Sequence, residues 1–476
     1  MPVIVTRAEM DDVPLVDVPA TTRGTRTNVR NLIVVNIIVG VLTCSTKIYE
    51  PVVGQYVYHR VADDVFGNDS RIKNYSVLAP CFQNTSDPGY VLVQTLQERS
   101  SSVMWHFSLV GGLIASVVNI GVGSYSDVVG RKFIFITCML GQLLRNAITS
   151  VIIGLHLSID YFYIVSSVDG LFGGSWGLLL LAYAYIADNT PPLRIRSFGI
   201  LLLECMNALA EAAASTAAGY FIVRSGFFYP SLLACCVTVF GIFLVAVCLT
   251  ETVVNTNSNQ SRCSYIFNVY YLFIKEGRRR QRLLLWVGLG AFFFSVISTS
   301  SEINVDLLFL MNQPFCWSPF QNGIYDTVST VVRRTVGAGV VKGLQRCISD
   351  EVLGVLGSVF VILGDVVFSI ATSGWMLYLA FPGIGLIGFL VTPIARGIMS
   401  KLVPPQRHGA VFASLAVVES LSSALGAVTF NNIYTASVAV WGGAVYAAMA
   451  ASHFLALWFF LAFRLLNKDG VPFETT

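Results

Sequence analysis

About twelve apolar runs, each of roughly the twenty residues that an α-helix needs to cross a bilayer, constrain this chain more than any other feature. Within lipid every backbone N–H and C=O group must be satisfied inside the segment, so such runs fold as helices. The first six runs are 31–50, 103–124, 133–155, 160–187, 198–223 and 228–250. The other six are 283–311, 320–345, 351–372, 375–397, 409–432 and 438–464. The sequence therefore predicts an all-α membrane protein with about twelve transmembrane helices in two six-helix halves.

Charged residues are sparse and unevenly placed. They make up 12% of the chain, against about 25% in soluble proteins, and a net charge of +3 is too small to indicate a nucleic-acid partner. Basic residues gather in loops that the positive-inside rule assigns to the cytosol: Arg131, Lys132, Arg194, Arg196, Lys275, Arg278, Arg279, Arg280, Arg282, Arg346, Lys401 and Arg407. Run 320–345 holds Arg333 and Arg334 at its centre, and we keep it because omitting it would put the chain ends on opposite sides of the membrane.

These assignments divide the chain into five parts. Residues 1–30 form a polar cytosolic tail without the apolar core of a cleaved signal peptide. The six-helix halves, 31–250 and 283–465, are separated by a basic cytosolic linker over 251–282, and residues 466–476 form a second cytosolic tail. We expect both termini in the cytosol, and either the plasma membrane or an endo-lysosomal membrane as the location.

The longest expected outer loop, residues 60–101, has the marks of a segment outside the cytosol. Asn68, Asn74 and Asn84 each begin an Asn-x-Ser/Thr acceptor sequence for N-glycosylation. Of the ten cysteines, Cys81 in this loop and Cys316 after run 283–311 are the two that we place outside. An oxidising exterior favours a disulfide between them.

The turn between the second and third runs has the pattern G-x-x-x-D-x-x-G-R-K, formed by Gly123, Asp127, Gly130, Arg131 and Lys132. Gly130 permits backbone angles that a side chain would forbid, and Asp127 lies one helical turn before Arg131, close enough to pair with it. An ordinary positive-inside turn with a chance aspartate is the alternative. The pattern resembles a signature of the major facilitator superfamily, where it acts as a breakable cytoplasmic latch.

Further stretches resemble one family of that superfamily, solute carrier family 46, whose members include proton-coupled transporters of folate. They are Pro51–Arg60, Pro314–Trp317, Thr392–Arg396, Ser400–Val403, Gly409–Ala413 and Phe430–Tyr434. The resemblance runs from about residue 48 to about residue 440. It implies a 6+6 transporter with its substrate site between the halves, near the bilayer midplane. The outer-loop disulfide of the family falls on Cys81 and Cys316.

Ionisable residues at membrane depth are costly unless paired or hydrated, so they mark a pathway by default. Here they are Arg145, Asp169, Glu204, Glu211, Glu302, Asp306, Arg333, Arg334, Asp365, Arg396 and Glu419. Glu204 and Glu211, seven residues apart, share one helix face. Desolvation disfavours the charged form of such a carboxyl group, which could then carry a proton. Glu204 matches the family's proton-coupling glutamate; the alternative is a carboxylate locked to an arginine of another helix.

Arg396, which follows Pro393, matches a family arginine implicated in substrate and proton binding. A guanidinium in a cavity can hold a carboxylate or phosphate through two parallel hydrogen bonds. Arg396, together with Glu211, is therefore a candidate for substrate binding. The alternative is a helix-end cation at the cytosolic interface, since Lys401 follows shortly.

The seventh run departs from the family's folate transporter, because Thr299 stands where that protein has a histidine. Glu302 and Asp306, four residues apart, lie on one face of this run. They could bind protons, cations or substrate, or they could pair with Arg333 and Arg334. We expect the pairing.

The sequence contains no nucleophile with a base, no zinc-type spacing and no nucleotide-phosphate loop. We therefore expect no enzymatic activity, no metal and no cofactor apart from a proton as coupling ion. The hypothesis is a secondary transporter that moves an organic, anionic solute (folate-like, a cyclic dinucleotide or a cell-wall fragment) by alternating access in symport with protons. Its expected partners are that solute and the bilayer. The alternatives are an uncoupled or sodium-coupled facilitator, and a receptor or scaffold that transports nothing.

Overall fold

The computed structural model describes residues 28–66, 88–191, 194–252, 268–275, 278–311, 314–317, 319–404 and 407–467. Within these ranges the chain forms helices and short connections, which confirms the expected all-α architecture. The first half contains α1 (Val29–Phe66), α2 (Pro88–Val129), α3 (Arg131–Gly154), η3 (Ile159–Tyr161), α4 (Phe162–Leu171), α5 (Gly174–Asp188), α6 (Arg194–Ser225) and α7 (Phe228–Cys248). The second half contains α9 (Arg279–Met311), α10 (Pro319–Leu344), α11 (Asp350–Ser369), α12 (Gly374–Tyr378), η5 (Leu379–Gly383), η6 (Ile384–Leu390), α13 (Val391–Lys401), α14 (His408–Trp441) and α15 (Ala444–Leu466).

Eleven of the described segments are long and apolar enough to cross a membrane. The run 320–345 corresponds to α10, which has 26 residues and is therefore long enough for a twelfth span. It is too polar to join the other eleven, since Asp326, Arg333 and Arg334 interrupt it. The described helices thus match the twelve expected runs, and the weakest run is the one that does not count among the eleven apolar segments.

Two of the expected spans are not continuous α-helices. The span over 160–187 breaks between α4 and α5, where Gly173 and Gly174 have positive φ angles of 89° and 59° that favour glycine. The span over 375–397 consists of α12, the π-helical η5, the 3-10 helix η6 and α13, with Pro382 inside η5. Irregular backbone at membrane depth is tolerated where it is buried in protein or lines a cavity.

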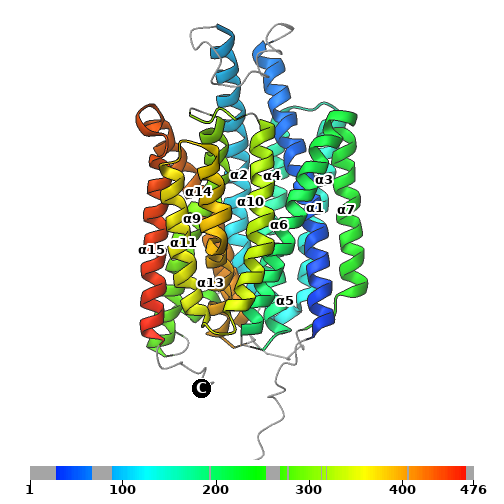
Figure 1. The fold of residues 1–476 in the computed structure, drawn as a ribbon. Helices are drawn as coiled ribbons and strands as arrows, with labels where there is room; N and C mark the ends of the chain where they lie inside the picture. The colour runs from blue at the N-terminus through cyan, green and yellow to red at the C-terminus, as the bar shows by residue number, and fades with distance from the viewer. Residues whose placement is uncertain are drawn as a thin grey trace, which may run out of the picture.

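The outer loop expected over 60–101 is shorter than predicted. Helix α1 continues to Phe66 and α2 begins at Pro88, and both helices project beyond the rest of the bundle (Figure 1). An apolar run marks the part of a helix that suits lipid, whereas polar residues can prolong the helix into water. The linker expected over 251–282 likewise includes a short helix, α8 (Asn268–Ile274).

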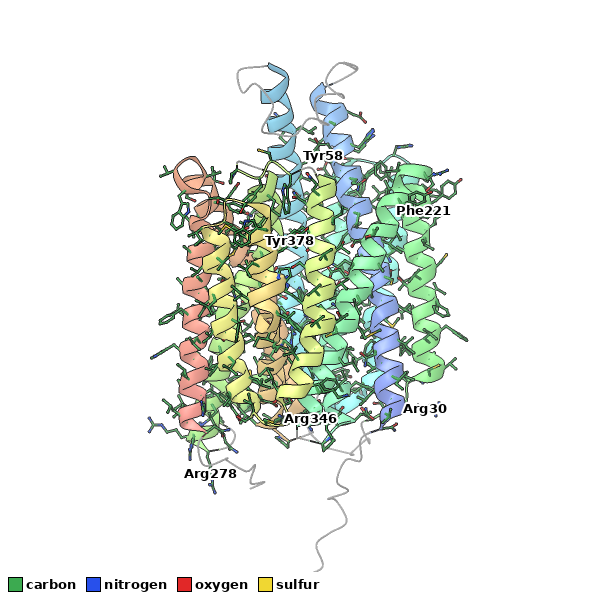
Figure 2. The ribbon with its side chains drawn as sticks, viewed as in Figure 1. Arg30, Tyr58, Phe221, Arg278, Arg346 and Tyr378 are labelled. Atoms are coloured by element: carbon green, nitrogen blue, oxygen red, sulfur yellow. The ribbon has the colours of Figure 1, made fainter. Side chains whose placement is uncertain are left out.

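The two halves stand side by side with their helices roughly parallel to one axis (Figure 1). Arg30, Arg278 and Arg346 mark one end of the bundle, which we call the basic end; Tyr58, Phe221 and Tyr378 mark the opposite end (Figure 2). Large apolar side chains such as Val117 and Trp458, which are 70% and 62% exposed, lie on the outer surface. That distribution suits a lipid environment.

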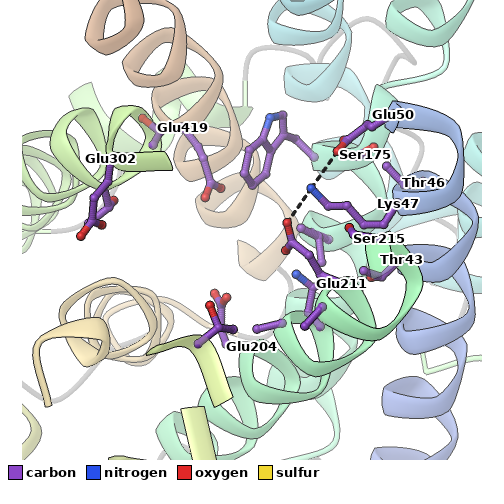
Figure 3. A pocket seen from close by; sticks show the side chains of 18 of the residues that line it. Thr43, Thr46, Lys47, Glu50, Ser175, Glu204, Glu211, Ser215, Glu302 and Glu419 are labelled. Carbon is purple, nitrogen blue, oxygen red and sulfur yellow. Dashed lines mark hydrogen bonds and ion pairs between the residues drawn. The ribbon is translucent and has the colours of Figure 1, made fainter. Parts of the chain in front are cut away.

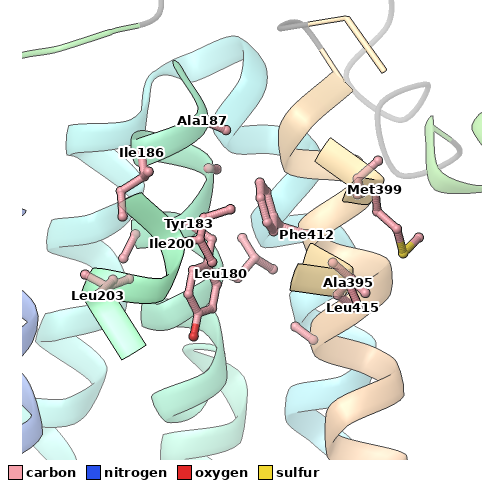
Figure 4. Close-up of a cluster of buried hydrophobic side chains, with 14 of the residues drawn as sticks. Leu180, Tyr183, Ile186, Ala187, Ile200, Leu203, Ala395, Met399, Phe412 and Leu415 are labelled. Atoms are coloured by element: carbon pink, nitrogen blue, oxygen red, sulfur yellow. The ribbon is translucent and has the colours of Figure 1, made fainter. Parts of the chain in front are cut away.

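An apolar cluster joins the halves near the basic end (Figure 4). Tyr183 of α5 stacks on Phe412 of α14 with ring centroids 5.9 Å apart. Leu180 and Leu203 from the first half, and Met399 from the second, belong to the same buried cluster. The cluster closes the space between the halves at this end, and it forms the floor of the cavity described next.

Candidate functional site

A cavity of about 1590 Å³ lies between the two halves and is lined by both. Its wall includes Tyr183 at the apolar cluster and reaches Gly323, one turn from the start of α10 at the end of the bundle opposite the basic end. Five lysine and arginine side chains and seven carboxylates line it. The cavity is therefore large and lined by many charged side chains, with more carboxylates than cations.

Arg396 of α13 is the centre of a charge network at the cavity floor. Arg396 is 2% exposed, and its guanidinium forms ion pairs with Glu204 of α6 and, at 2.5 Å, with Glu419 of α14. The hydroxyl of Tyr183 donates to Glu204 at 2.7 Å, and the guanidinium lies over the rings of Tyr183 and Phe292 at 4.5 and 5.2 Å. The network links the two halves through one cation and two carboxylates. Arg396 thus lies in the cavity wall, and Glu204 is paired with an arginine from the other half.

A second cation with two carboxylates lies in the first half, and no sequence motif indicates it. Lys47 of α1 contacts Glu50 at 2.8 Å and Glu211 of α6 at 2.6 Å (Figure 3). Glu302 lies across the cavity from Lys47 (Figure 3). A lysine three residues before a glutamate at the end of an apolar run was the available signal. Glu211, a predicted substrate-binding residue, therefore faces the cavity in an ion pair.

One further ion pair and one hydrogen-bonded pair contribute to the polar interior of the bundle. Arg145 of α3 contacts Asp169 of α4 at 3.2 Å and lies 4.1 Å from the ring centroid of Tyr49. In the second half, buried Asp365 of α11 accepts a hydrogen bond from His453 of α15 at 2.8 Å. Each of these pairs lies within one half.

The pairing expected for the two acids of α9 is only half present. Glu302 lies 3.8 Å from Arg333, at the outer limit of an ion pair. Asp306 accepts a hydrogen bond from the hydroxyl of Tyr446 at 2.6 Å instead of contacting an arginine. Arg334, one residue beyond Arg333, points about 100° away around α10, so one helix face cannot bring both acids to both arginines.

The turn with the latch pattern lies at the basic end and contacts the other half. Arg131, 1% exposed, pairs with Asp127 and with Asp188 of α5, the latter at 3.0 Å. Asp188 contacts His408 of α14 at 2.9 Å, and the backbone N–H of Gly409 donates to Asp127 at 2.9 Å. The buried charges of the turn are thus tied to the start of α14. Asp188 and His408 are members of this network that the sequence pattern does not contain.

The glycines and Lys132 of the same turn have separate structural roles. Gly130 has a φ of 119°, and Glu251 accepts from the backbone N–H groups of Arg131 and Lys132 at 2.8 and 3.1 Å. A Cβ on Gly123 would lie 2.3 Å from the carbonyl oxygen of Gly409. Helices α2 and α14 therefore approach each other more closely than side chains would allow.

Several predicted residues lie outside the described ranges. Asn68, Asn74, Asn84 and Cys81 are among them. Cys316 is disulfide-bonded, and its pairing with Cys81 remains a prediction. Within the described residues, no group of three or more His, Cys, Asp and Glu side chains could hold a metal ion.

Comparisons with known proteins agree with this fold. The model of the Major Facilitator Superfamily matches residues 77–427. The lysosomal proton-coupled steroid conjugate and bile acid symporter SLC46A3 of Gallus gallus is 24% identical over 421 residues, which cover 87% of this chain and 90% of the relative. The proton-coupled folate transporter of Rattus norvegicus is 28% identical over 389 residues, which cover 82% of each chain. The crystal structure of the human organic anion transporter MFSD10 (TETRAN) has a TM-score of 0.69 at 17% identity, covering 91% of this chain and 99% of that chain, which shows a shared fold.

Proposed function

The chain belongs to the major facilitator superfamily, and from this premise we propose that it is a proton-coupled secondary transporter of an organic anion. Its resemblance to solute carrier family 46 is confirmed by the curated relatives, which are named as transporters and not as enzymes. Both relatives are also named as proton-coupled. The substrate and the coupling ion of this chain are our inference from its own cavity.

The network of Arg396, Glu204 and Glu419 carries this proposal. One guanidinium can neutralise only one of the two carboxylates, which leaves one negative charge in excess when all three groups are ionised. Glu204 comes from the first half, whereas Arg396 and Glu419 come from the second. A proton on Glu204 weakens its pairing with Arg396, which loosens the contact between the halves. Proton binding is thereby linked to the separation that alternating access requires.

The charges of the whole cavity support proton coupling as well. Seven carboxylates against five lysine and arginine side chains leave two negative charges in excess when all are ionised. Such a wall repels an organic anion unless protons or cations enter with it. Proton uptake from an acidic compartment removes this repulsion. The charges that line the cavity therefore support symport of a proton with an anion.

The class of substrate is proposed from the cavity and from the relatives. A volume of about 1590 Å³ exceeds what a sugar-sized solute needs and suits a molecule with a sizeable organic body. The relatives are named for steroid conjugates, bile acids and folate. We propose a substrate of this kind, with an apolar or aromatic body and an acidic group; a cyclic dinucleotide or a cell-wall fragment also fits that description.

The setting of the protein is proposed on the same basis. The membrane-length helices and apolar outer surface place it in a bilayer. The basic end would face the cytosol by the positive-inside rule, which would put both termini there and open the cavity towards the lumen or exterior. One relative is named as lysosomal, so we propose a lysosomal or plasma membrane.

Uptake measured with and without a pH gradient tests the function. Cells expressing the chain would receive labelled taurocholate, folate or a cyclic dinucleotide at about pH 5.5 and about pH 7.5, a range in which desolvated carboxyl groups titrate. We expect uptake to rise in acid, and Glu204→Gln to reduce the acid stimulation at least about tenfold, which corresponds to about 1.4 kcal/mol. Asp160→Asn is the matched control, because Asp160 is exposed and does not line the cavity.

The remaining outcomes separate the alternatives. Uptake that changes neither with pH nor in the Glu204→Gln variant would identify an uncoupled facilitator. Uptake that depends on the sodium concentration would identify a sodium-coupled one. Failure to take up any of these anions at normal surface expression would count against the transporter and favour a receptor or scaffold.

A further inference from the structure

Two consecutive arginines of α10 differ from the other cations of the cavity, because their charges are not neutralised by close carboxylates. Arg396 and Lys47 each contact two carboxylates, and Arg145 contacts one at 3.2 Å. The nearest carboxylate to Arg333 is that of Glu302 at 3.8 Å. Arg334 has no carboxylate within ion-pair distance among the described residues. Both arginines line the cavity.

Each of these arginines lies over an aromatic ring supplied by the irregular span. The guanidinium carbon of Arg334 is 5.1 Å from the ring centroid of Phe389, and that of Arg333 is 5.2 Å from the ring centroid of Phe381. A planar guanidinium that lies on a ring keeps the N–H groups at its edge free for an oxyanion. The rings therefore orient the two cations without competing for their hydrogen-bond donors.

The ring beneath Arg334 is held in place by a close helix contact. A Cβ on Gly337, three residues beyond Arg334, would lie 2.4 Å from the Phe389 ring and 2.7 Å from the carbonyl oxygen of Leu386. Phe389 lies in η6 and Phe381 in η5, the segments that are not α-helical. Departures from α-helix frequently mark functional sites. The irregular backbone and the glycine together build the aromatic support for the arginines.

We propose that Arg333 and Arg334 form the site that binds the acidic group of the organic-anion substrate. A carboxylate, sulfate or phosphate ester would accept paired hydrogen bonds from the edges of the stacked guanidinium groups. Arg396, already bound to two carboxylates, holds the halves together and does not bind the substrate's acidic group. This inference deepens the proposed function and rests on it.

The site adjoins the proton-coupling network. The thiol of Cys205 on α6 donates to the carbonyl oxygen of Arg334 at 3.2 Å, which holds α10 against α6 one residue from Glu204. The backbone of Arg334 therefore packs beside the part of α6 that carries Glu204, and both residues line the cavity. A bound anion and the ionised carboxylate of Glu204 would repel each other, and a proton on Glu204 removes that repulsion. Anion binding and proton binding therefore favour each other, and such a coupling is reciprocal.

Binding to purified full-length protein tests the site. The probes are pregnenolone sulfate and its uncharged parent pregnenolone, which share one apolar body and differ in the acidic group. We expect Arg334→Gln to weaken binding of the sulfate at least about tenfold and to leave binding of pregnenolone unchanged. Arg334→Lys should fall between Gln and wild type, because lysine keeps the charge and loses the paired donors. Arg224→Gln is the matched control, since Arg224 also lies over a ring, that of Tyr220 at 5.6 Å, but outside the cavity.

Three other results would contradict the proposed site. Equal binding of pregnenolone sulfate by wild type and Arg334→Gln, with loss in Arg396→Gln, would place the anion on Arg396 and refute this inference alone. Equally tight competition by inorganic sulfate, or by phosphatidylglycerol, would show an inorganic-anion or lipid site in place of a substrate site. Wild-type protein that binds neither pregnenolone sulfate nor folate would refute the proposed function and this inference together.

Discussion

Tyr183 occupies the point where the charge network meets the apolar cluster. Its hydroxyl donates to Glu204 at 2.7 Å, its ring lies 4.5 Å from the guanidinium carbon of Arg396, and the same ring stacks on Phe412. Tyr183 therefore contacts Glu204 through its hydroxyl while its ring supports the packing between the halves.

Replacing Tyr183 with Phe separates these two roles. Tyr183→Phe removes a hydrogen bond to a charged group, worth about 1.5–3 kcal/mol, and keeps the ring. Because the proposed proton-coupling residue Glu204 then loses one of its partners, the pH dependence of uptake should change, whereas the packing between the halves should not. The measurement is the pH profile of substrate uptake. Tyr185→Phe is the control, since the hydroxyl of Tyr185 bonds Thr250 outside the network; an identical profile in both variants would exclude this role of Tyr183.

At the scale of single elements, α10 shows what a sequence can and cannot predict. Its length and position are predictable, and so is the presence of charge in the middle of the run. The partners of Arg333 and Arg334 are not, because the pairing depends on how α10 is rotated against α9 and on the irregular η5 and η6. Those segments contain Pro382, but a proline alone does not specify a π-helix beside a 3-10 helix.

The sequence likewise predicts the residues of the charge network at the cavity floor but not the contacts between them. Motifs identify Glu204 and Arg396 as separate residues. A pair between Glu204 and an arginine of another helix is one of two open interpretations, and the sequence does not indicate which arginine. Glu419 belongs to the expected set of membrane-embedded charges, but its contact with Arg396 joins residues 23 positions apart on different helices. Lys47 and Glu50 stand at the end of an apolar run, where a few charges do not change the helix prediction. Contacts between helices depend on tertiary packing that one run does not encode.

The crossing of α2 and α14 gives a prediction about an element contact. A Cβ on Gly123 would lie 2.3 Å from the carbonyl oxygen of Gly409 and 2.6 Å from the Cβ of Ala413. Overpacking of this kind costs about 1–3 kcal/mol, so Gly123→Ala should lower the melting temperature of the detergent-solubilised protein and reduce uptake. A Cβ on Gly121 meets nothing within 4 Å, and Gly121→Ala should behave as wild type. Equal stability of the two variants would mean that the contact does not constrain the helices.

Across the whole molecule, side-chain contacts fasten the halves together at the basic end. Arg196 of α6 donates to the carbonyl oxygen of Ser400 at 2.9 Å, and Ser197 donates to Asp350 of α11 at 2.5 Å. The contacts of Asp127 with Gly409, and of Asp188 with His408, lie at the same end. The cavity lies beyond them, towards the opposite end. Transport by alternating access requires these contacts to break so that the cavity can open at the basic end.

A reversible cross-link at the basic end tests this requirement directly. The Cβ of Ser197 on α6 lies 3.0 Å from the position of a Cβ on Gly397 of α13, so a shift of about half an ångström suits the separation of about 3.5–4.5 Å in disulfides. In proteoliposomes, the oxidised double variant Ser197→Cys with Gly397→Cys should bind substrate but transport it at least about tenfold more slowly. Dithiothreitol should restore transport, and each single variant serves as a control for the native cysteines. If the cross-linked protein transports as fast as its reduced form, the basic end does not open during the cycle. Another motion must then expose the substrate site to each side of the membrane in turn.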